Sequence, residues 1–155
     1  MGNIKGIECS LYNGRIEELL HFLSNKPFDF YIQRCMKIDA TQILPKLSNN
    51  FCISSHDLRR LSRESIWELV MYVYPIDSSD QTIEIDSSRK TIETYDDFIQ
   101  SPCICCLIFY DCGLLDLYVK ESNLREQLYD LLLSLEATDM ELITDVSDSR
   151  TYMHL

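Results

Sequence analysis

Two apolar runs separated by a tight turn constrain the fold of this chain more than any other feature of its sequence. The first run, CICCLIFY, covers residues 103–110, and the second, LLDLYVK, covers residues 114–120. Residues 111–113, Asp-Cys-Gly, form a short link of the kind that joins the two strands of a β-hairpin. Both runs are short and rich in aromatic and branched residues, which favours strands. We therefore predict a buried antiparallel hairpin at residues 103–120.

The rest of the chain alternates short apolar segments with helical patterns. Further strands are expected at residues 4–11, 28–38, 66–76, 82–85 and 140–144, with a polar turn and a short terminal strand at the end. Helices are expected at residues 13–27 with Asn13 as N-cap, at 94–102 with Thr94 as N-cap, and at 122–137. Residues 40–65 are expected to be irregular, apart from a short helix capped by Ser55. These elements predict an α+β fold, a mostly antiparallel sheet with two or three helices packed on one face.

Length and composition are those of one ordinary globular unit. The chain has 155 residues, of which 46% are hydrophobic and 25% charged, so we expect a single domain over residues 1–155. The N-terminus lacks the apolar core of a signal peptide, and no run of about 18 apolar residues is present. We therefore expect a cytoplasmic protein with no membrane contact.

Four of the seven cysteines lie within residues 103–112. Such a cluster can be a metal site, a redox centre or a catalytic thiol, or it can simply pack in the core. In a strand, Cys103 and Cys105 would share one face at about 6.7 Å, with Cys106 on the other, which is too wide for adjacent ligands of one zinc ion. We therefore predict buried thiols in a strand, no metal and no cofactor.

Three further motifs have a chemical and a structural interpretation. They are His56-Asp57, Asp96-Asp97, and the group Asp145, Asp148 and Arg150. In the same order, the chemical interpretations are a metal-binding dyad, a pair of carboxylates for a metal or for acid–base catalysis, and a charged pocket. The structural ones, which we favour, are two helix starts and a turn held by carboxylate bonds to backbone N–H groups. The sequence also has no phosphate-binding glycine loop and no nucleophile elbow, so we do not expect an enzyme.

Three stretches resemble a family of small uncharacterised bacterial proteins, a domain of unknown function of about 150 residues. They are KGIECSLYNGRIEELLHFLSNKPFDFYIQ, TIETYDDFIQSPCICCLIFYDCGLLDLYVK and LITDVSDSRTYM. The pieces TYDDFI, followed by the apolar strand, and ITD…D.RT are the most specific. The resemblance implies a bacterial cytoplasmic single domain, and it implies no catalytic residues.

Negative charge is concentrated in the second half of the chain. Residues 1–75 carry a net charge of +1 and residues 76–155 a net charge of −12. Such a surface opposes binding to nucleic acid and favours a basic protein partner. The sequence therefore favours a protein-binding or inhibitory module, of the kind that gives immunity to a basic toxin such as a nuclease. The residues expected to bind the partner are Asp77, Asp80, Glu84 and Asp86.

The same charge is compatible with two alternatives. It can serve solubility alone. The protein can also be an enzyme or small-ligand binder whose site is dispersed along the sequence. Clustered carboxylates with raised pKa in a cleft would favour such a site, and a flat or convex acidic face would favour the inhibitor.

Overall fold

The computed structural model describes residues 3–38, 46–63, 65–76, 92–111, 113–150 and 152–153. Within them the strands are β1 (Ile4–Ser10), β2 (Phe28–Ile38), β3 (Lys46–Ile53), β4 (Ser65–Pro75), β5 (Cys105–Tyr110), β6 (Leu114–Val119) and β7 (Thr138–Thr144). The helices are the 3-10 turn η1 (Asn13–Arg15) and the α-helices α1 (Ile16–Ser24), α2 (Ser55–Ser62), α3 (Tyr95–Gln100) and α4 (Ser122–Ser134).

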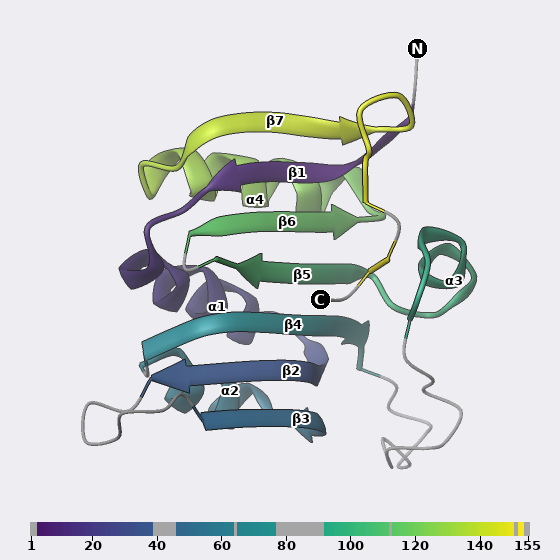
Figure 1. Cartoon of the computed structure of the whole chain (residues 1–155). Coiled ribbons are helices and arrows are strands. Elements are labelled where there is room, and N and C mark those ends of the chain that lie inside the picture. Colours follow the sequence, from purple (N-terminus) through teal and green to yellow (C-terminus); the bar gives the residue numbers. More distant parts are fainter. Residues whose placement is uncertain are drawn as a thin grey trace.

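The seven strands form one antiparallel sheet in the order β3-β2-β4-β5-β6-β1-β7 (Figure 1). The predicted hairpin is confirmed as β5 and β6 in the middle of the sheet, where Leu107 lies opposite Leu117. Its turn contains Asp111 at a φ of 50°, and the Gly113 N–H donates to the Tyr110 carbonyl over 3.2 Å. The most apolar part of the sequence thus forms the centre of the sheet.

Helices lie on both faces of this sheet. Side chains of α1, α2 and α4 belong to one hydrophobic cluster, and these helices lie behind the sheet in Figure 1. Helix α3 places Phe98 in a second cluster, with Val70, Tyr72 and Ile108 of the sheet. The α+β class with an antiparallel sheet is confirmed, but α3 departs from the expected single helical face. The strands expose apolar side chains on both faces, so both need a cover.

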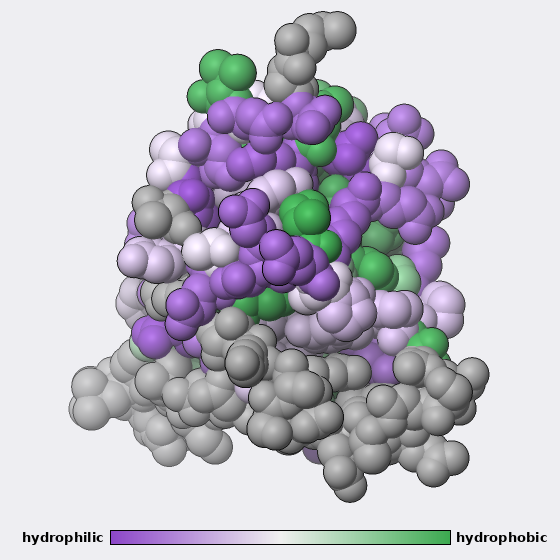
Figure 2. Space-filling model, turned by 90° about the vertical axis from the view of Figure 1, so that its right-hand side faces the viewer, coloured by the Kyte–Doolittle hydropathy of each residue, from purple (hydrophilic) through white to green (hydrophobic). Residues whose placement is uncertain are grey.

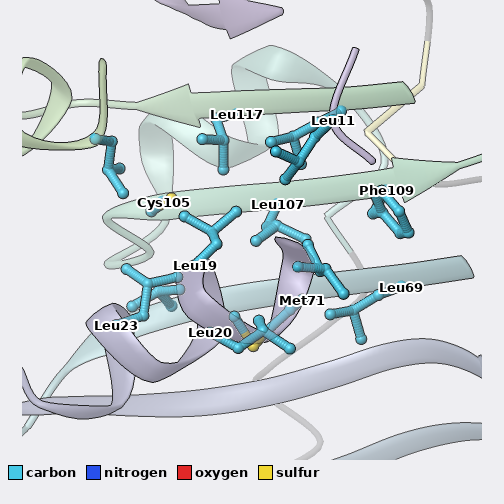
Figure 3. Close-up of a cluster of buried hydrophobic side chains, with 14 of the residues drawn as sticks. Leu11, Leu19, Leu20, Leu23, Leu69, Met71, Cys105, Leu107, Phe109 and Leu117 are labelled. Carbon is cyan, nitrogen blue, oxygen red and sulfur yellow. The ribbon is translucent and has the colours of Figure 1, made fainter. Parts of the chain in front are cut away.

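The leucines of α1 recur at helical spacing, and the structure places them on the face of the helix that packs against the sheet. Leu19, Leu20 and Leu23 of α1 belong to one buried cluster with Met71, Cys105 and Leu107 of the sheet (Figure 3). All six side chains are fully buried. Burying a leucine of this kind contributes about 1.5–3 kcal/mol.

Helix α4 covers the sheet near β1 and β6. Leu124, Leu128, Leu132 and Leu135 are buried, and Leu131 packs partly buried against the same cluster. By its spacing alone, this leucine row is compatible with either a core or a groove for a partner helix. The structure places it in the core.

The cysteines of the hairpin are buried, as predicted. Cys103, Cys105 and Cys106 have no exposed surface, and the six cysteines that the structure describes are free thiols. The expectation that Cys103 and Cys105 share a face is wrong. Cys105 belongs to the helix-side cluster, whereas Cys103 and Cys106 belong to the opposite one. The regular strand begins only at Cys105, so the alternation does not extend back to Cys103.

The segment expected to be irregular contains an edge strand. β3 pairs with β2 along its length, with Phe30 opposite Ile53. Its sequence, KLSNNFCI, lacks a clear apolar alternation, which is why it does not predict a strand. The short helix that follows is confirmed as α2, but its N-cap is Ser54, whose hydroxyl accepts the Asp57 N–H over 3.1 Å. Ser55, the predicted cap, is its first residue.

Further helix and strand boundaries differ in smaller ways. The predicted N-cap Asn13 is wrong: Asn13 is the first residue of the 3-10 turn η1, and the residue that precedes α1 is Arg15, which makes no side-chain cap bond. The predicted cap of α3 is correct, because Thr94 and Asp97 form a capping box. In residues 145–150 and 152–153 the structure has no strand, and the strand predicted at 82–85 lies outside the described residues. No helix in the described ranges is both long and apolar enough to cross a membrane.

Candidate functional site

A cleft of about 300 Å³ opens on the face of the sheet opposite to α1, α2 and α4. Its lining comes from strands β1, β5 and β6 and from residues 148–150 and 152, which follow β7; these three strands are neighbours in the sheet (Figure 1). The lining residues are Glu8, Tyr110, Asp116, Tyr118, Asp148, Ser149, Arg150 and Tyr152. The side of the molecule that carries the turn after β7 is mostly hydrophilic in its described part (Figure 2).

Strand alternation places the polar side chains of the sheet in this cleft. Leu115 and Leu117 of β6 belong to the helix-side core, so Asp116 between them faces the other way. Glu8 of β1 lies opposite Asp116 on one side and opposite Glu141 of β7 on the other. Three carboxylates therefore form a row across three neighbouring strands. Like charges that face each other across strands are destabilising, so the fold does not explain this row.

Arg150 pairs with the most buried carboxylate of the row. Its Nη2 and Nε atoms lie 2.7 Å and 3.1 Å from one oxygen, Oδ2 of Asp116. Its guanidinium carbon lies 5.1 Å from the ring centre of Tyr110, a cation–π arrangement. Asp116 is only 8% exposed. Burial alone would lower the pKa of Arg150, but the hydrogen bond and charge of Asp116 raise it overall.

A second ion pair holds the turn that forms the other end of the cleft. Lys5 Nζ lies 3.1 Å from Oδ2 of Asp148 and 3.7 Å from Oδ1 of Asp145. The Tyr118 hydroxyl donates to Oδ1 of Asp148 over 3.0 Å, and the Arg150 N–H donates to the same oxygen over 3.1 Å. The Asp148 side chain thus links the sheet to the chain after β7.

Glu8 differs from these carboxylates in its surroundings. Burial raises the pKa of Glu8, and so do the nearby charges of Asp116 and Glu141 and a hydrogen bond with Glu141. Among the ion pairs between described residues, none includes Glu8 or Glu141. The lining of the cleft therefore holds three carboxylates, Glu8, Asp116 and Asp148, and one cation, Arg150, and Lys5 pairs with Asp148 from outside the lining. A positively charged group would be attracted there.

Among the described residues, the thiols and carboxylates do not form a metal site or a reactive thiol. No group of three or more His, Cys, Asp or Glu among the described residues is placed to hold a metal ion. Burial raises the pKa of Cys9 to about 12, and it also raises the pKa of Cys105 and Cys106. Thiols in this state are poor nucleophiles and poor metal ligands.

The residues predicted to bind a partner cannot be compared with this geometry. Asp77, Asp80, Glu84 and Asp86 all lie outside the described residues. The turn predicted at 145–150 is confirmed, because Asp145 accepts the Asn3 N–H over 3.1 Å and Asp148 accepts the Arg150 N–H. Asp148 and Arg150 also line the cleft whereas Asp145 does not, so the charged-pocket interpretation holds for two of its three residues.

The remaining two motifs lie at helix starts. His56 and Asp57 are exposed in the first turn of α2. Asp97 accepts the N–H groups of Glu93 and Thr94 at the start of α3, and these bonds lower its pKa. Both motifs therefore have the structural role that we favoured.

The sequence interpretation missed the residues that form the floor of the cleft. These are Glu8, Tyr110, Asp116 and Tyr118. One signal was available: Asp116 is the sole charged residue inside the apolar run LLDLYV. A charge within a central strand is rarely buried without a partner, so it pointed to a second charged group across the sheet face.

Comparison with known proteins shows which family the chain belongs to. A protein from Bacillus subtilis (strain 168), the uncharacterized protein YncE, is 35% identical over 60 residues. The matched part is 39% of this chain and 39% of that protein. No solved structure matches the chain. A family model described as "Protein of unknown function (DUF2691)" matches residues 5–154, which confirms the resemblance seen in the sequence. The chain therefore belongs to this family of proteins of unknown function, DUF2691.

Proposed function

We propose that the protein is a binding module that takes a guanidinium or ammonium group into the cleft beside Glu8. Such a group has two sources. It can be an arginine or lysine side chain of a basic protein partner, or it can belong to a small free cation. An immunity-type protein that neutralises a basic toxin, for example a nuclease, is the first case. A small-ligand binder is the second.

The observation that supports this proposal is the uncompensated charge of Glu8. Asp116 and Asp148 each lie close to a cation of the chain itself, Arg150 and Lys5, whereas Glu8 lies between two further carboxylates. Burial raises the pKa of Glu8 most, and the charges of Asp116 and Glu141 raise it further; a bound cation would relieve that repulsion between charges. An anion would meet the same carboxylates and would be repelled.

The size and lining of the cleft agree with a small polar group. About 300 Å³ is at the lower end of ligand-binding sites, which span roughly 300–1,000 Å³. Tyr110 and Tyr118 line the cleft beside the carboxylates, where the Tyr118 hydroxyl donates to Asp148 and the Arg150 guanidinium lies over the Tyr110 ring. Aromatic rings beside carboxylates are a common way to bind an organic cation.

A titration with simple cations tests the shared chemistry. Methylguanidinium and methylammonium are added to 15N-labelled protein, and amide shifts are followed by NMR. We expect saturable shifts centred on Glu8, Tyr118 and Arg150. Glu8→Gln should weaken binding about tenfold, because it removes the uncompensated charge. Glu126→Gln, an exposed position on α4, is the matched control and should bind like wild type. Unsaturable shifts spread over the whole acidic surface would refute the proposal.

Capture of a protein partner from the source lysate separates the two sources. If the partner is a basic protein, Glu8→Gln should weaken its binding in parallel with that of methylguanidinium. Charge reversal of Asp77, Asp80, Glu84 and Asp86 to Lys should slow association at low salt, because charges at the rim of an interface act mainly on the association rate. An unchanged rate in that quadruple variant would remove these four residues from the recognition surface.

A further inference from the structure

Arg150 already occupies part of the cleft in the way that a bound guanidinium would. Two of its nitrogens contact Asp116, its guanidinium lies near the ring of Tyr110, and Nη1 donates to the Tyr152 carbonyl over 3.4 Å. A carboxylate with an adjacent aromatic ring is a general solution for binding arginine. The chain therefore contains both a guanidinium site and its occupant.

The backbone on both sides of Arg150 is anchored independently of its side chain. Before it, Asp148 is held by Lys5 and Tyr118. After it, the Met153 N–H donates to the Glu93 carbonyl over 2.8 Å, and the Met153 side chain is 2% exposed in the second core cluster. Release of the Arg150 side chain thus needs rotation about side-chain bonds, with the anchored chain left in place.

If a cationic ligand replaces the Arg150 guanidinium, the buried carboxylate of Asp116 still has a positively charged partner. Asp116 is buried, so loss of its cation would be strongly destabilising, because the carboxylate would be left as an unpaired buried charge. If an incoming guanidinium replaces that of Arg150, Asp116 keeps a partner throughout. The Arg150 side chain is 18% exposed in the pair and would be hydrated on release.

We propose that Arg150 is an internal competitor, whose guanidinium holds the Asp116–Tyr110 site until a cationic ligand displaces it. This inference rests on the proposed function of the cleft. Its consequence is that the apparent affinity for a cation is reduced by the fraction of molecules in which Arg150 occupies the site. The positive charge of Arg150 also offsets part of the attraction that Glu8 exerts.

The test compares methylguanidinium binding to wild type, Arg150→Met and Arg150→Lys by calorimetry and NMR. We expect Arg150→Met to bind methylguanidinium at least about tenfold more tightly than wild type, because the competitor is gone. Arg150→Lys keeps a charge but loses the planar group, so its affinity should lie between the two. Methylguanidinium should raise the melting temperature of Arg150→Met more than that of wild type, and Asp116→Asn in the Arg150→Met background should abolish this gain.

The outcomes of this test separate the inference from the proposed function. Binding to wild type with equal or weaker binding to Arg150→Met would overturn the competitor role and leave the proposed function standing. No saturable binding to any of the proteins would overturn both. A purely structural role of Arg150 would lower the melting temperature of Arg150→Met without raising its affinity. If Arg150→Met does not fold, equal affinities of wild type and Arg150→Lys would overturn the inference.

Discussion

The two faces of the sheet are covered in different ways, although the same strands supply both. On one face, α1, α2 and α4 cover a continuous apolar cluster. On the other, α3 and Met153 cover a smaller cluster, and beside it Asp116, Asp148 and Arg150 hold the chain after β7 in place by charge pairs. The first face is a core that needs only apolar bulk. The second depends on specific polar partners and leaves a cleft.

This difference bears on where function can reside. An apolar core tolerates the exchange of one apolar side chain for another of similar volume, but it presents no polar group to a ligand. Paired charges fix the positions of their side chains and leave polar groups that a ligand can contact. The excess carboxylates of the second face have no structural explanation in the described part of the chain. Three predictions test the contrast between the faces, in order of decreasing effect.

The largest effect is expected on the helix-covered face. Leu107→Ala removes a fully buried side chain from the middle of β5 and should lower the free energy of unfolding by about 3 kcal/mol. Urea denaturation measures it. Leu133→Ala, at a position 53% exposed on α4, is the control and should change stability by less than about 0.5 kcal/mol. Cation binding in the cleft should survive in Leu107→Ala under conditions where it is folded. A loss below about 1 kcal/mol would contradict the assigned core.

An intermediate effect is expected from the polar contacts of the second face. The Asp148 side chain is 7% exposed and accepts from Tyr118, Arg150 and Lys5. Asp148→Ala should therefore cost about 2 kcal/mol, as expected for hydrogen bonds to a charged group. The Asp145 side chain is 52% exposed, so Asp145→Ala should cost only about 0.5 kcal/mol. Thermal and urea unfolding of both variants measure the difference, and equal losses would show that Asp148 does not anchor the chain after β7.

The helix-covered face is also the part that the sequence predicted best. Leu19, Leu20 and Leu23 indicate it through their spacing, and the central hairpin is indicated by two apolar runs around Gly113. The edge strand β3 was missed because its polar residues carry no alternation, and an edge strand is specified by its pairing with a neighbour.

The cleft was harder to predict for a different physical reason. Asp116 and Arg150 are 34 residues apart, and Glu8 lies 108 residues before Asp116 in the sequence, yet strand pairing and the turn after β7 bring them together. Nothing local in the sequence encodes such proximity. The motif at 145–150 predicts a turn or a charged pocket, but it does not indicate its partner residues, because these depend on the register between β1 and β6.

The smallest effect, and the one with an unusual sign, is expected at Glu8. Its pKa is raised by burial and by the charges of Asp116 and Glu141, so the ionised form destabilises the folded state at neutral pH. Glu8→Gln removes that charge and should stabilise the protein by about 0.5 kcal/mol at neutral pH. The gain should shrink as the pH falls through the raised pKa, because protonated Glu8 and Gln are both neutral. Below the unfolded-state pKa the two proteins should have equal stability.

Urea denaturation of wild type, Glu8→Gln and Glu126→Gln over a range of pH measures this effect. The exposed control Glu126→Gln should show no stabilisation at neutral pH. A variant that gains stability while it loses cation binding would show that Glu8 is kept for a function, at a cost to the fold. If Glu8→Gln instead loses stability at neutral pH, the ionised carboxylate has a favourable partner, and the cleft holds no uncompensated charge for a cation to neutralise.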